Sequence, residues 1–147
     1  MKWLLDTNVV SESIRPRPAP GVLSWISSQP AEDMAISVVT LAELRDGAST
    51  VGDEGRRQRL ERWIDTEVVA SFTDHTLPLT VDILAHWLFL ARSLAAKGRP
   101  RSAPDLLIAA TAQVHNLIIV SRNYQDFMGA DVAVFDPWTD KTHRMGA

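Results

Sequence analysis

The first ten residues constrain the fold more than any other stretch of the chain. Trp3-Leu4-Leu5 is an apolar run that ends at Asp6, and Thr7 and Asn8 follow before apolar residues resume. A short apolar run bounded by polar residues is typical of a strand buried on both faces, as in a parallel sheet covered by helices. Thr7 or Asn8 can cap a following helix. Asp6 is therefore expected at the carboxyl end of a central strand, either as a helix-capping acid or as part of the ligand crevice that open α/β sheets place there.

Composition indicates an ordinary globular domain. We expect residues 1–147 to form one domain with a single core. The chain has no cysteine, which excludes disulfides and thiolate metal sites and fits a reducing cytoplasm. We see no signal peptide and no apolar run near the roughly 18 residues of a membrane helix, so we expect a cytoplasmic protein without a membrane partner. The net charge of -3 gives no overall attraction to nucleic acid, so such contacts must come from local basic clusters.

Apolar periodicity predicts strands that alternate with helices. Short strands or extended pieces are expected after the first one at 34–37, 76–79, 117–120 and 132–135. Helices are expected at 9–14, 22–26, from 41 onward, and at 53–71, 81–97 and 105–112, with a loose tail after Asp136. Strict alternation favours an α/β domain with a mainly parallel sheet.

Two features of these helices bear on core and partners. In the helix at 81–97 the side chains expected to face inward are Ile83, Leu84, Trp87, Leu88, Leu90, Ala91 and Leu94. The helix at 53–71 carries a basic side that is either a solvated face or a surface that attracts RNA, formed by Arg56, Arg57, Arg59 and Arg62. The chain also has five tryptophans, which either fill the core or anchor interfaces, the candidates for interfaces being Trp25, Trp63 and Trp87.

Acidic and amide side chains recur where a strand ends or a helix begins. They are Asp6, Glu43, Asp105 and the pair Asn123 and Asp126. Right-handed crossovers place all such positions along one edge of a parallel sheet. Carboxylates gathered there in a partly dry cleft repel one another unless a cation neutralises them. An all-oxygen ligand set without cysteine or paired histidines suits Mg²⁺ or Mn²⁺ rather than zinc.

For two of these acids a simpler role is equally open. Glu43 has capping-box spacing from Thr40, so it can bond back to the start of its own helix. Asp105 stands one residue after Pro104, in the first turn of an alanine-rich, buried helix, where a carboxylate faces the positive end of the helix dipole.

Four segments together resemble the PIN-domain family, and within it the VapC-like toxins of bacterial toxin–antitoxin pairs. They are 4–12, 36–47, 105–112, and 120–123 with Asp126-Phe127. Their order and spacing match over nearly the whole chain, and the segment Arg122-Asn123-x-x-Asp126-Phe127 is similar to that of the FitB-like branch. The resemblance implies a PIN-like three-layer α/β/α sandwich with a mainly parallel sheet of four to five short strands.

The resemblance also implies an activity: a Mg²⁺- or Mn²⁺-dependent endoribonuclease that hydrolyses RNA phosphodiester bonds. Asp6 and Asp105 would be the principal metal ligands, and Glu43 would bind metal through water or orient the nucleophile. Asn123 stands where some relatives have aspartate, and Asp126 can supply that charge instead. The fourth acidic position, and with it a two-metal mechanism, therefore stays open.

Supporting residues and partners follow from the same resemblance. Thr7 and Ser121 would hydrogen-bond the carboxylates or a phosphate. A cognate antitoxin would lie across the acidic cleft and place an arginine among the carboxylates. The toxin would form a homodimer, and operator DNA would be bound only through the antitoxin.

Two other functions fit parts of the pattern. A PIN-fold binding module without turnover would keep the fold but would have no reason to take up metal. A haloacid-dehalogenase-type phosphatase also begins with a strand that ends in aspartate, but it needs a second aspartate two residues later, where this chain has Asn8.

Overall fold

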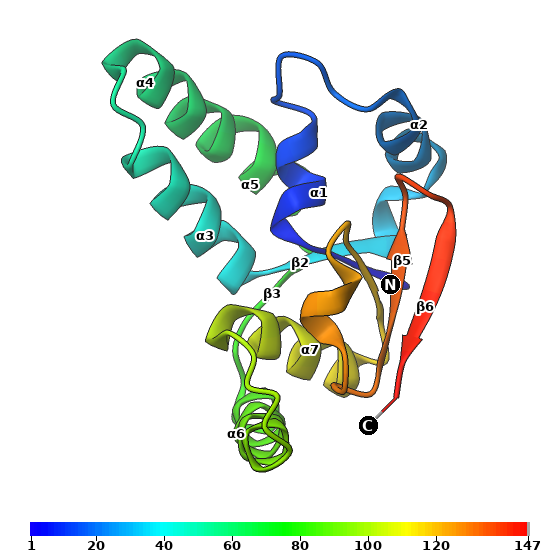
Figure 1. Cartoon of the computed structure of the whole chain (residues 1–147). Coiled ribbons are helices and arrows are strands. Elements are labelled where there is room, and N and C mark those ends of the chain that lie inside the picture. Colours follow the sequence, from blue (N-terminus) through cyan, green and yellow to red (C-terminus); the bar gives the residue numbers. More distant parts are fainter. Residues whose placement is uncertain (147) are drawn as a thin grey trace.

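β1 (Trp3–Leu5) lies in the middle of the sheet in the computed structural model, which describes residues 1–146. Within that range the sheet has six strands in the order β3-β2-β1-β4-β5-β6. The other strands are β2 (Met34–Ser37), β3 (Thr76–Leu77), β4 (Ile118–Val120), β5 (Val132–Asp136) and β6 (Lys141–Met145). The strands from β3 to β5 run parallel, and β6 runs antiparallel to β5 (Figure 1).

The register of the central strands aligns the positions that follow them. Leu5 at the end of β1 pairs with Val120 at the end of β4. The Asp6 amide then donates to the Val120 carbonyl at 2.9 Å, and the Ser121 amide donates to the Phe135 carbonyl at 3.0 Å. Asp6 and Ser121 therefore leave the sheet side by side at its carboxyl edge.

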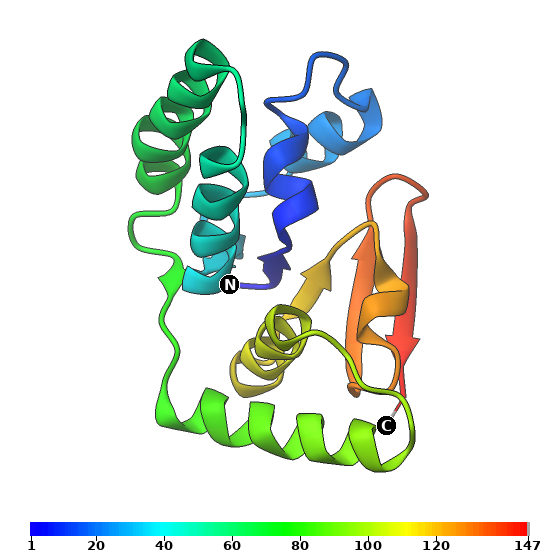
Figure 2. The same cartoon turned by 60° about the vertical axis from the view of Figure 1, so that its left-hand side comes forward.

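Helices cover both faces of this sheet. The α-helices are α1 (Thr7–Glu12), α2 (Pro20–Ser28), α3 (Val38–Ser49), α4 (Glu54–Trp63), α5 (Val69–Ser71), α6 (Val81–Ala96) and α7 (Ala103–His115). The other helical segments are the 3-10 helices η1 (Ala31–Asp33) and η3 (Tyr124–Phe127), and the π-helix η2 (Ile64–Val68). Figures 1 and 2 show α6 and α7 on one side of the sheet and α1 to α5 on the other.

Alternate side chains of β1 enter two separate cores. Leu4 packs in the core beneath α6 and α7, with Leu94 and Ile108 among its members. Trp3 and Leu5 pack in the opposite core, beneath α1 to α5. Because successive side chains of a strand point to opposite faces, a fully apolar strand requires both faces to be covered. The mainly parallel sheet with a core on each face confirms the α/β/α class predicted from the sequence.

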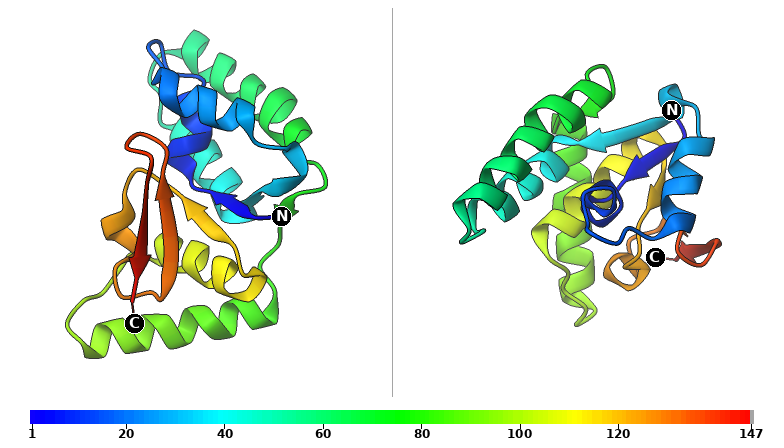
Figure 3. Two further views of the ribbon diagram at one scale, coloured as in Figure 1. Left: turned by 90° about the vertical axis from the view of Figure 1, so that its right-hand side faces the viewer. Right: turned by 90° about the horizontal axis from the view of Figure 1, so that it is seen from above.

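The prediction of a loose C-terminal tail, and with it a sheet of four to five strands, was wrong. Residues 141–145 form β6, which pairs with β5 along its whole length (Figure 3). An edge strand presents unpaired amide and carbonyl groups, so a tail that turns back onto it satisfies them. Tyr124 also stacks on His143, with ring centroids 3.8 Å apart, and so attaches β6 to η3.

The predicted inward face of α6 was only partly right. Ile83, Leu90 and Leu94 are buried, whereas Leu84 and Leu88 are exposed. α6 lies at the outer edge of the molecule and packs mainly on α7, so only one stripe of its apolar residues is covered (Figure 2). No helix within residues 1–146 combines the length and hydropathy that crossing a membrane requires.

The helical stretch predicted at 53–71 forms, but with a change of helix type. The Asp53 side chain caps α4 by accepting from the Arg56 amide at 3.0 Å, and η2 then inserts one π-helical turn. The buried residues Trp63 and Ile64 join the core beneath α1 to α5. Trp25 packs edge-on against Trp3 at 5.2 Å, so core packing accounts for Trp25 and Trp63 better than an interface does.

Candidate active site

Asp6 follows β1 at the carboxyl edge of the sheet and is only 8% exposed. Its Oδ1 accepts from the Thr7 amide at 2.8 Å, so Asp6 itself is the N-cap of α1. The expectation that Thr7 or Asn8 caps this helix was wrong, because the helix begins one residue earlier than a cap at Thr7 would allow. The capping bond uses Oδ1, whereas Oδ2 accepts from Ser121 in another segment of the chain.

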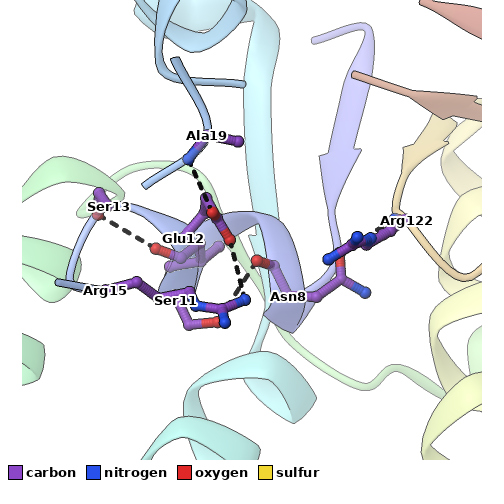
Figure 4. A network of polar contacts seen from close by, with 8 residues as sticks. Asn8, Ser11, Glu12, Ser13, Arg15, Ala19 and Arg122 are labelled. Atoms are coloured by element: carbon purple, nitrogen blue, oxygen red, sulfur yellow. Dashed lines mark hydrogen bonds and ion pairs between the residues drawn. The ribbon is translucent and has the colours of Figure 1, made fainter. Parts of the chain in front are cut away.

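Ser121 and Asn8 bind that second oxygen. Ser121 Oγ donates to Asp6 Oδ2 at 2.8 Å, and Asn8 Nδ2 donates to the same oxygen at 3.2 Å. Asn8 also donates to Ser121 Oγ at 3.1 Å and accepts from the Arg122 amide at 3.1 Å, as its orientation toward Arg122 in Figure 4 shows. Sequence reasoning missed this role of Asn8. The signal was its position two residues after Asp6, but its partner lies 113 residues away in the chain.

The far end of α1 is also held in place. Glu12 is buried and accepts from the Ala19 amide at 2.9 Å, while Arg15 lies 3.6 Å from its other oxygen (Figure 4). These contacts tie the helix to the proline-rich loop that follows it. With Asn8 bonded at one end and Glu12 at the other, α1 gives Asp6 a rigid support.

Glu43 reaches the site from α3. This helix begins at Val38, and Ser37 caps it by accepting from the Val39 amide at 3.0 Å. The expected start at Leu41 was therefore three residues late, and Thr40 lies inside the helix rather than at its cap. Instead of forming a capping box, Glu43 Oε1 accepts from Thr7 Oγ1 at 2.8 Å.

Asp105 lies in the first turn of α7, where Ser102 is the N-cap. Ser102 Oγ donates to Asp105 Oδ2 at 2.6 Å. In return, the backbone amide of Asp105 donates to Ser102 Oγ at 3.3 Å. Ser102 was not among the predicted site residues. The spacing of a serine three residues before an acid, just ahead of an apolar helix, was the signal that could have found it.

Electrostatics shows that these acids act on one another. The pKa of Asp6 is raised to about 6, mainly by burial and further by the charges of Asp105 and Glu43, against the lowering effect of the hydrogen bonds from Ser121 and Thr7. Burial also raises the pKa of Asp105, and the charge of Asp126 adds to this, while Ser102 and Arg101 oppose it. The structure thus brings Asp6, Glu43, Asp105 and Asp126 into one electrostatic cluster.

Asn123 contributes differently from the acids. Its side chain is exposed, and its backbone amide donates to Ser121 Oγ at 3.1 Å. Asp126 is half-buried in η3, where its amide donates to the Asn123 carbonyl at 3.0 Å. Of the two candidates for the fourth acidic position, Asp126 is therefore the one whose charge reaches Asp105.

The donor set of the cluster is made of oxygens alone, which suits Mg²⁺ or Mn²⁺. Among residues 1–146, no three acidic or histidine side chains lie close enough together to form a ready-made metal cage. Neither of the two ion pairs in that range involves a member of the cluster, so no lysine or arginine is bonded to these carboxylates. A cation that keeps several of its own waters, as Mg²⁺ does, fits such an open set of acids.

Comparison with known families assigns the chain to a family. The PIN-domain family model matches residues 3–129, which include all the acids of the cluster. The chain belongs to the PIN-domain family. Two curated relatives are similar along most of their length: Toxin FitB of Neisseria gonorrhoeae, 36% identical over 93% of this chain and 99% of that protein, and VapC ribonuclease Y4jK of Sinorhizobium fredii, 31% identical over 92% and 96%.

Solved structures agree with the sequence relatives. The PIN domain described above superposes on FitAcB from Neisseria gonorrhoeae with a TM-score of 0.86, at 35% identity over 92% of this chain and 98% of that one. FitAB bound to an IR36 DNA fragment gives 0.85 at 34% identity, over 92% and 95%. The resemblance to VapC-like and FitB-like PIN proteins is thereby confirmed, and the haloacid-dehalogenase-type phosphatase is set aside.

Proposed function

We propose that this PIN-domain protein is the toxin of a type II toxin–antitoxin system and acts as a Mg²⁺- or Mn²⁺-dependent endoribonuclease. The observation that carries the proposal is the cluster itself, in which the charges of Asp105 and Glu43 act on the buried Asp6. Burying mutually repelling carboxylates is costly unless a cation is bound in the working state. A relative named VapC ribonuclease and one named Toxin FitB support both the reaction and the biological role.

In this proposal Asp6 and Asp105 would hold the metal, and Glu43 would bind it through water or orient the nucleophile. The bound ion would lower the pKa of the attacking water and offset charge on the phosphate in the transition state. Ser121 and Asn8 hold Asp6 Oδ2 in place, and the Thr7 hydroxyl fixes Glu43 Oε1. Outer hydrogen bonds of this kind typically contribute about 10- to 100-fold to affinity or activity.

The test of the reaction is a cleavage assay with and without metal. Purified protein is expected to cleave structured RNA in the presence of Mg²⁺ or Mn²⁺. Addition of EDTA should stop the cleavage. Calorimetric titration with Mn²⁺ should show uptake that Asp6→Asn reduces. A protein that takes up no Mn²⁺ and leaves RNA intact would instead be the catalytically silent PIN-fold binding module.

The partners of the proposed toxin follow from its charges. A cognate antitoxin that places an arginine among Asp6, Glu43 and Asp105 would neutralise the cluster and compete for the metal position. The solved relative FitAB is bound to DNA, and we propose that this chain reaches operator DNA only through its antitoxin. Because its proposed substrate is cellular RNA, we place the toxin in the cytoplasm.

We further propose a homodimer, with the exposed side of α6 at the interface. Val81, Leu84 and Leu88 lie one or two turns apart on this helix, and Leu88 and the adjacent Phe89 are 53% and 66% exposed. A stripe of exposed apolar residues on one helix can pair with itself across a two-fold axis and so remove this surface from water.

Leu88→Glu with Phe89→Glu is expected to convert the dimer to a monomer, because the two new charges of each protomer would be buried against those of its partner at the two-fold axis. Sedimentation velocity measures the change. The matched control is Ile14→Glu, which alters an exposed apolar residue outside α6 and should leave the dimer intact. A wild-type monomer would contradict the homodimer, and a double variant that stays dimeric would exclude α6 as its interface.

A further inference from the structure

One arginine lies at the same edge of the sheet as the acids. Arg122 follows Ser121, the residue whose hydroxyl donates to Asp6 Oδ2. Its backbone amide donates to Asn8 Oδ1 at 3.1 Å, and Figure 4 shows Asn8 oriented toward it. The side chain of Arg122 is exposed, and neither of the two ion pairs within residues 1–146 includes it. In that part of the chain Arg122 therefore carries a positive charge close to the carboxylates without being paired to one of them.

An indole ring holds the Arg122 guanidinium. Arg122 Cζ lies 5.3 Å from the centre of the Trp138 ring and above its face, within the range of a cation–π contact. Stacking engages the flat face of a guanidinium, so the N–H donors in its plane stay available. Among the described residues, the hydrogen bond of Arg122 to Asn8 comes from its backbone and uses none of these donors. The guanidinium is thus oriented by Trp138 and free to donate.

The Trp138 ring is itself fixed in place. Its backbone amide donates to Asp136 Oδ1 at 2.8 Å, and Asp136 is only 5% exposed. The Asp140 amide closes the same turn by donating to the Asp136 carbonyl at 2.8 Å. The half-buried indole packs against the core beneath α1 to α5. The ring beneath Arg122 is therefore ordered by contacts that do not involve the arginine.

The order of the strands places this pair beside the acids. β1 pairs with β4 and β4 with β5, all parallel, so Asp6, Arg122 and the turn that holds Trp138 follow one another along the carboxyl edge. Figure 3 shows that turn at the same end of the sheet as α1. Neighbouring strands are about 4.8 Å apart, so the end of β5 lies roughly 10 Å from the end of β1. A guanidinium over Trp138 is thus beside the acidic cluster rather than within it.

We propose that Arg122, oriented by Trp138, binds a phosphate of the RNA strand next to the bond that is cut. The inference rests on the proposed ribonuclease function. RNA whose cleaved phosphate reaches the acids brings further phosphates on either side of it, and a guanidinium binds phosphate oxygens through paired N–H donors. A carboxylate of a protein partner suits the same donors, but the proposed reaction itself requires a chain of phosphates at this edge of the sheet.

The experiment compares Arg122→Ala with Arg56→Ala, a matched control that removes an exposed arginine of α4. Binding of a fluorescent single-stranded RNA is measured by anisotropy in EDTA at several salt concentrations, so that no cleavage occurs. Arg122→Ala should bind roughly tenfold more weakly, because one charge-assisted contact is lost, with a salt slope smaller by about one. Arg56→Ala should match the wild type. In turnover with Mg²⁺, Arg122→Ala should raise KM and leave kcat nearly unchanged, because the phosphate it binds is not the one that reacts.

Two changes at Trp138 test the stacking separately from the charge. Trp138→Phe keeps an aromatic face and should bind RNA nearly as the wild type does. Trp138→Leu removes that face and should weaken binding several-fold with the salt slope unchanged, because the Arg122 charge is still present. Thermal unfolding confirms that each variant is folded, and the two arginine variants decide the proposal if Trp138→Leu is not.

The outcomes separate the two proposals. Wild-type protein that neither binds nor cuts RNA would refute the ribonuclease function and this inference with it. RNA binding that Arg122→Ala leaves unchanged, or that Arg56→Ala weakens equally, would overturn the role of Arg122 alone. An Arg122→Ala variant that keeps RNA binding but loses the antitoxin would overturn it in favour of a protein partner. A loss confined to kcat would overturn the assignment to a neighbouring phosphate.

Discussion

Asp6→Asn and Asp105→Asn are each expected to reduce RNA cleavage by about 10²-fold or more, which is the size of effect seen when one preorganised charge-stabilising group is removed from an active site. Each substitution keeps the shape of the side chain and removes one negative charge from the cluster. Glu43→Gln should have a smaller effect, because the proposed contact of Glu43 with the metal runs through water. Initial rates on one RNA substrate at saturating Mg²⁺ provide the comparison.

The matched control is Asp46→Asn. Asp46 is an exposed carboxylate on α3, the helix that also carries Glu43, so the change in net charge is the same. Rates equal to the wild type are expected for this control. If Asp6→Asn and Asp105→Asn also cut at the wild-type rate, the acidic cluster does not perform the reaction.

The same assay resolves the fourth acidic position. Asp126→Asn should slow cleavage, because the charge of Asp126 acts on Asp105. Asn123→Ala should have little effect, because the side chain is exposed and the structural contact at this residue comes from its backbone amide. The reverse ranking would move the fourth position to Asn123.

Asp6→Asn is also expected to stabilise the fold at alkaline pH. The pKa of Asp6 is raised from 3.8 to about 6 in the folded protein, so the folded state binds the proton more tightly than the unfolded chain. Protonated Asp6 therefore stabilises the folded state of the wild type below pH 4. This stabilisation is lost as the pH rises through 6, which lowers the free energy of unfolding by up to about 3 kcal/mol. The asparagine side chain of the variant does not titrate, so the variant avoids this loss.

Urea unfolding at pH 4 and pH 8 measures the effect. The difference in unfolding free energy between Asp6→Asn and the wild type should be larger at pH 8 than at pH 4, whereas Asp46→Asn should show no such change. Mg²⁺ at pH 8 should return stability to the wild type and little to Asp6→Asn, since a ligand stabilises only the state that binds it. A pH-independent difference would mean that the folded protein does not disfavour the Asp6 carboxylate.

Much of the fold could be predicted because it depends on local patterns. The apolar runs at Trp3–Leu5 and Met34–Ser37 match β1 and β2 at their C-terminal ends, since a buried parallel strand is apolar at every position. The convergence of Asp6, Glu43 and Asp105 followed from the handedness of the crossovers, which does not depend on side-chain detail. That rule places residues along one edge, and it says nothing about their individual bonds.

What failed depended on partners far along the chain. Asn8 bonds Ser121, and β6 adds to β5 only because that strand lies at the edge of the sheet. Leu84 and Leu88 have the spacing of buried residues, yet α6 lies at the periphery and covers only one stripe. Periodicity records which face of a helix is apolar and cannot record whether another element of the same chain reaches it.

The amino-acid sequence alone therefore determined the class of fold and the edge of the sheet at which the acids gather, because these follow from hydrophobic period and chain handedness, and the resemblance of its motif segments indicated the family. The tertiary structure decided which groups bond the oxygens of Asp6, Glu43 and Asp105, and that Asp6 is buried enough for its pKa to be raised. Those properties depend on distances between atoms of separate segments, and only packing of the whole chain sets such distances.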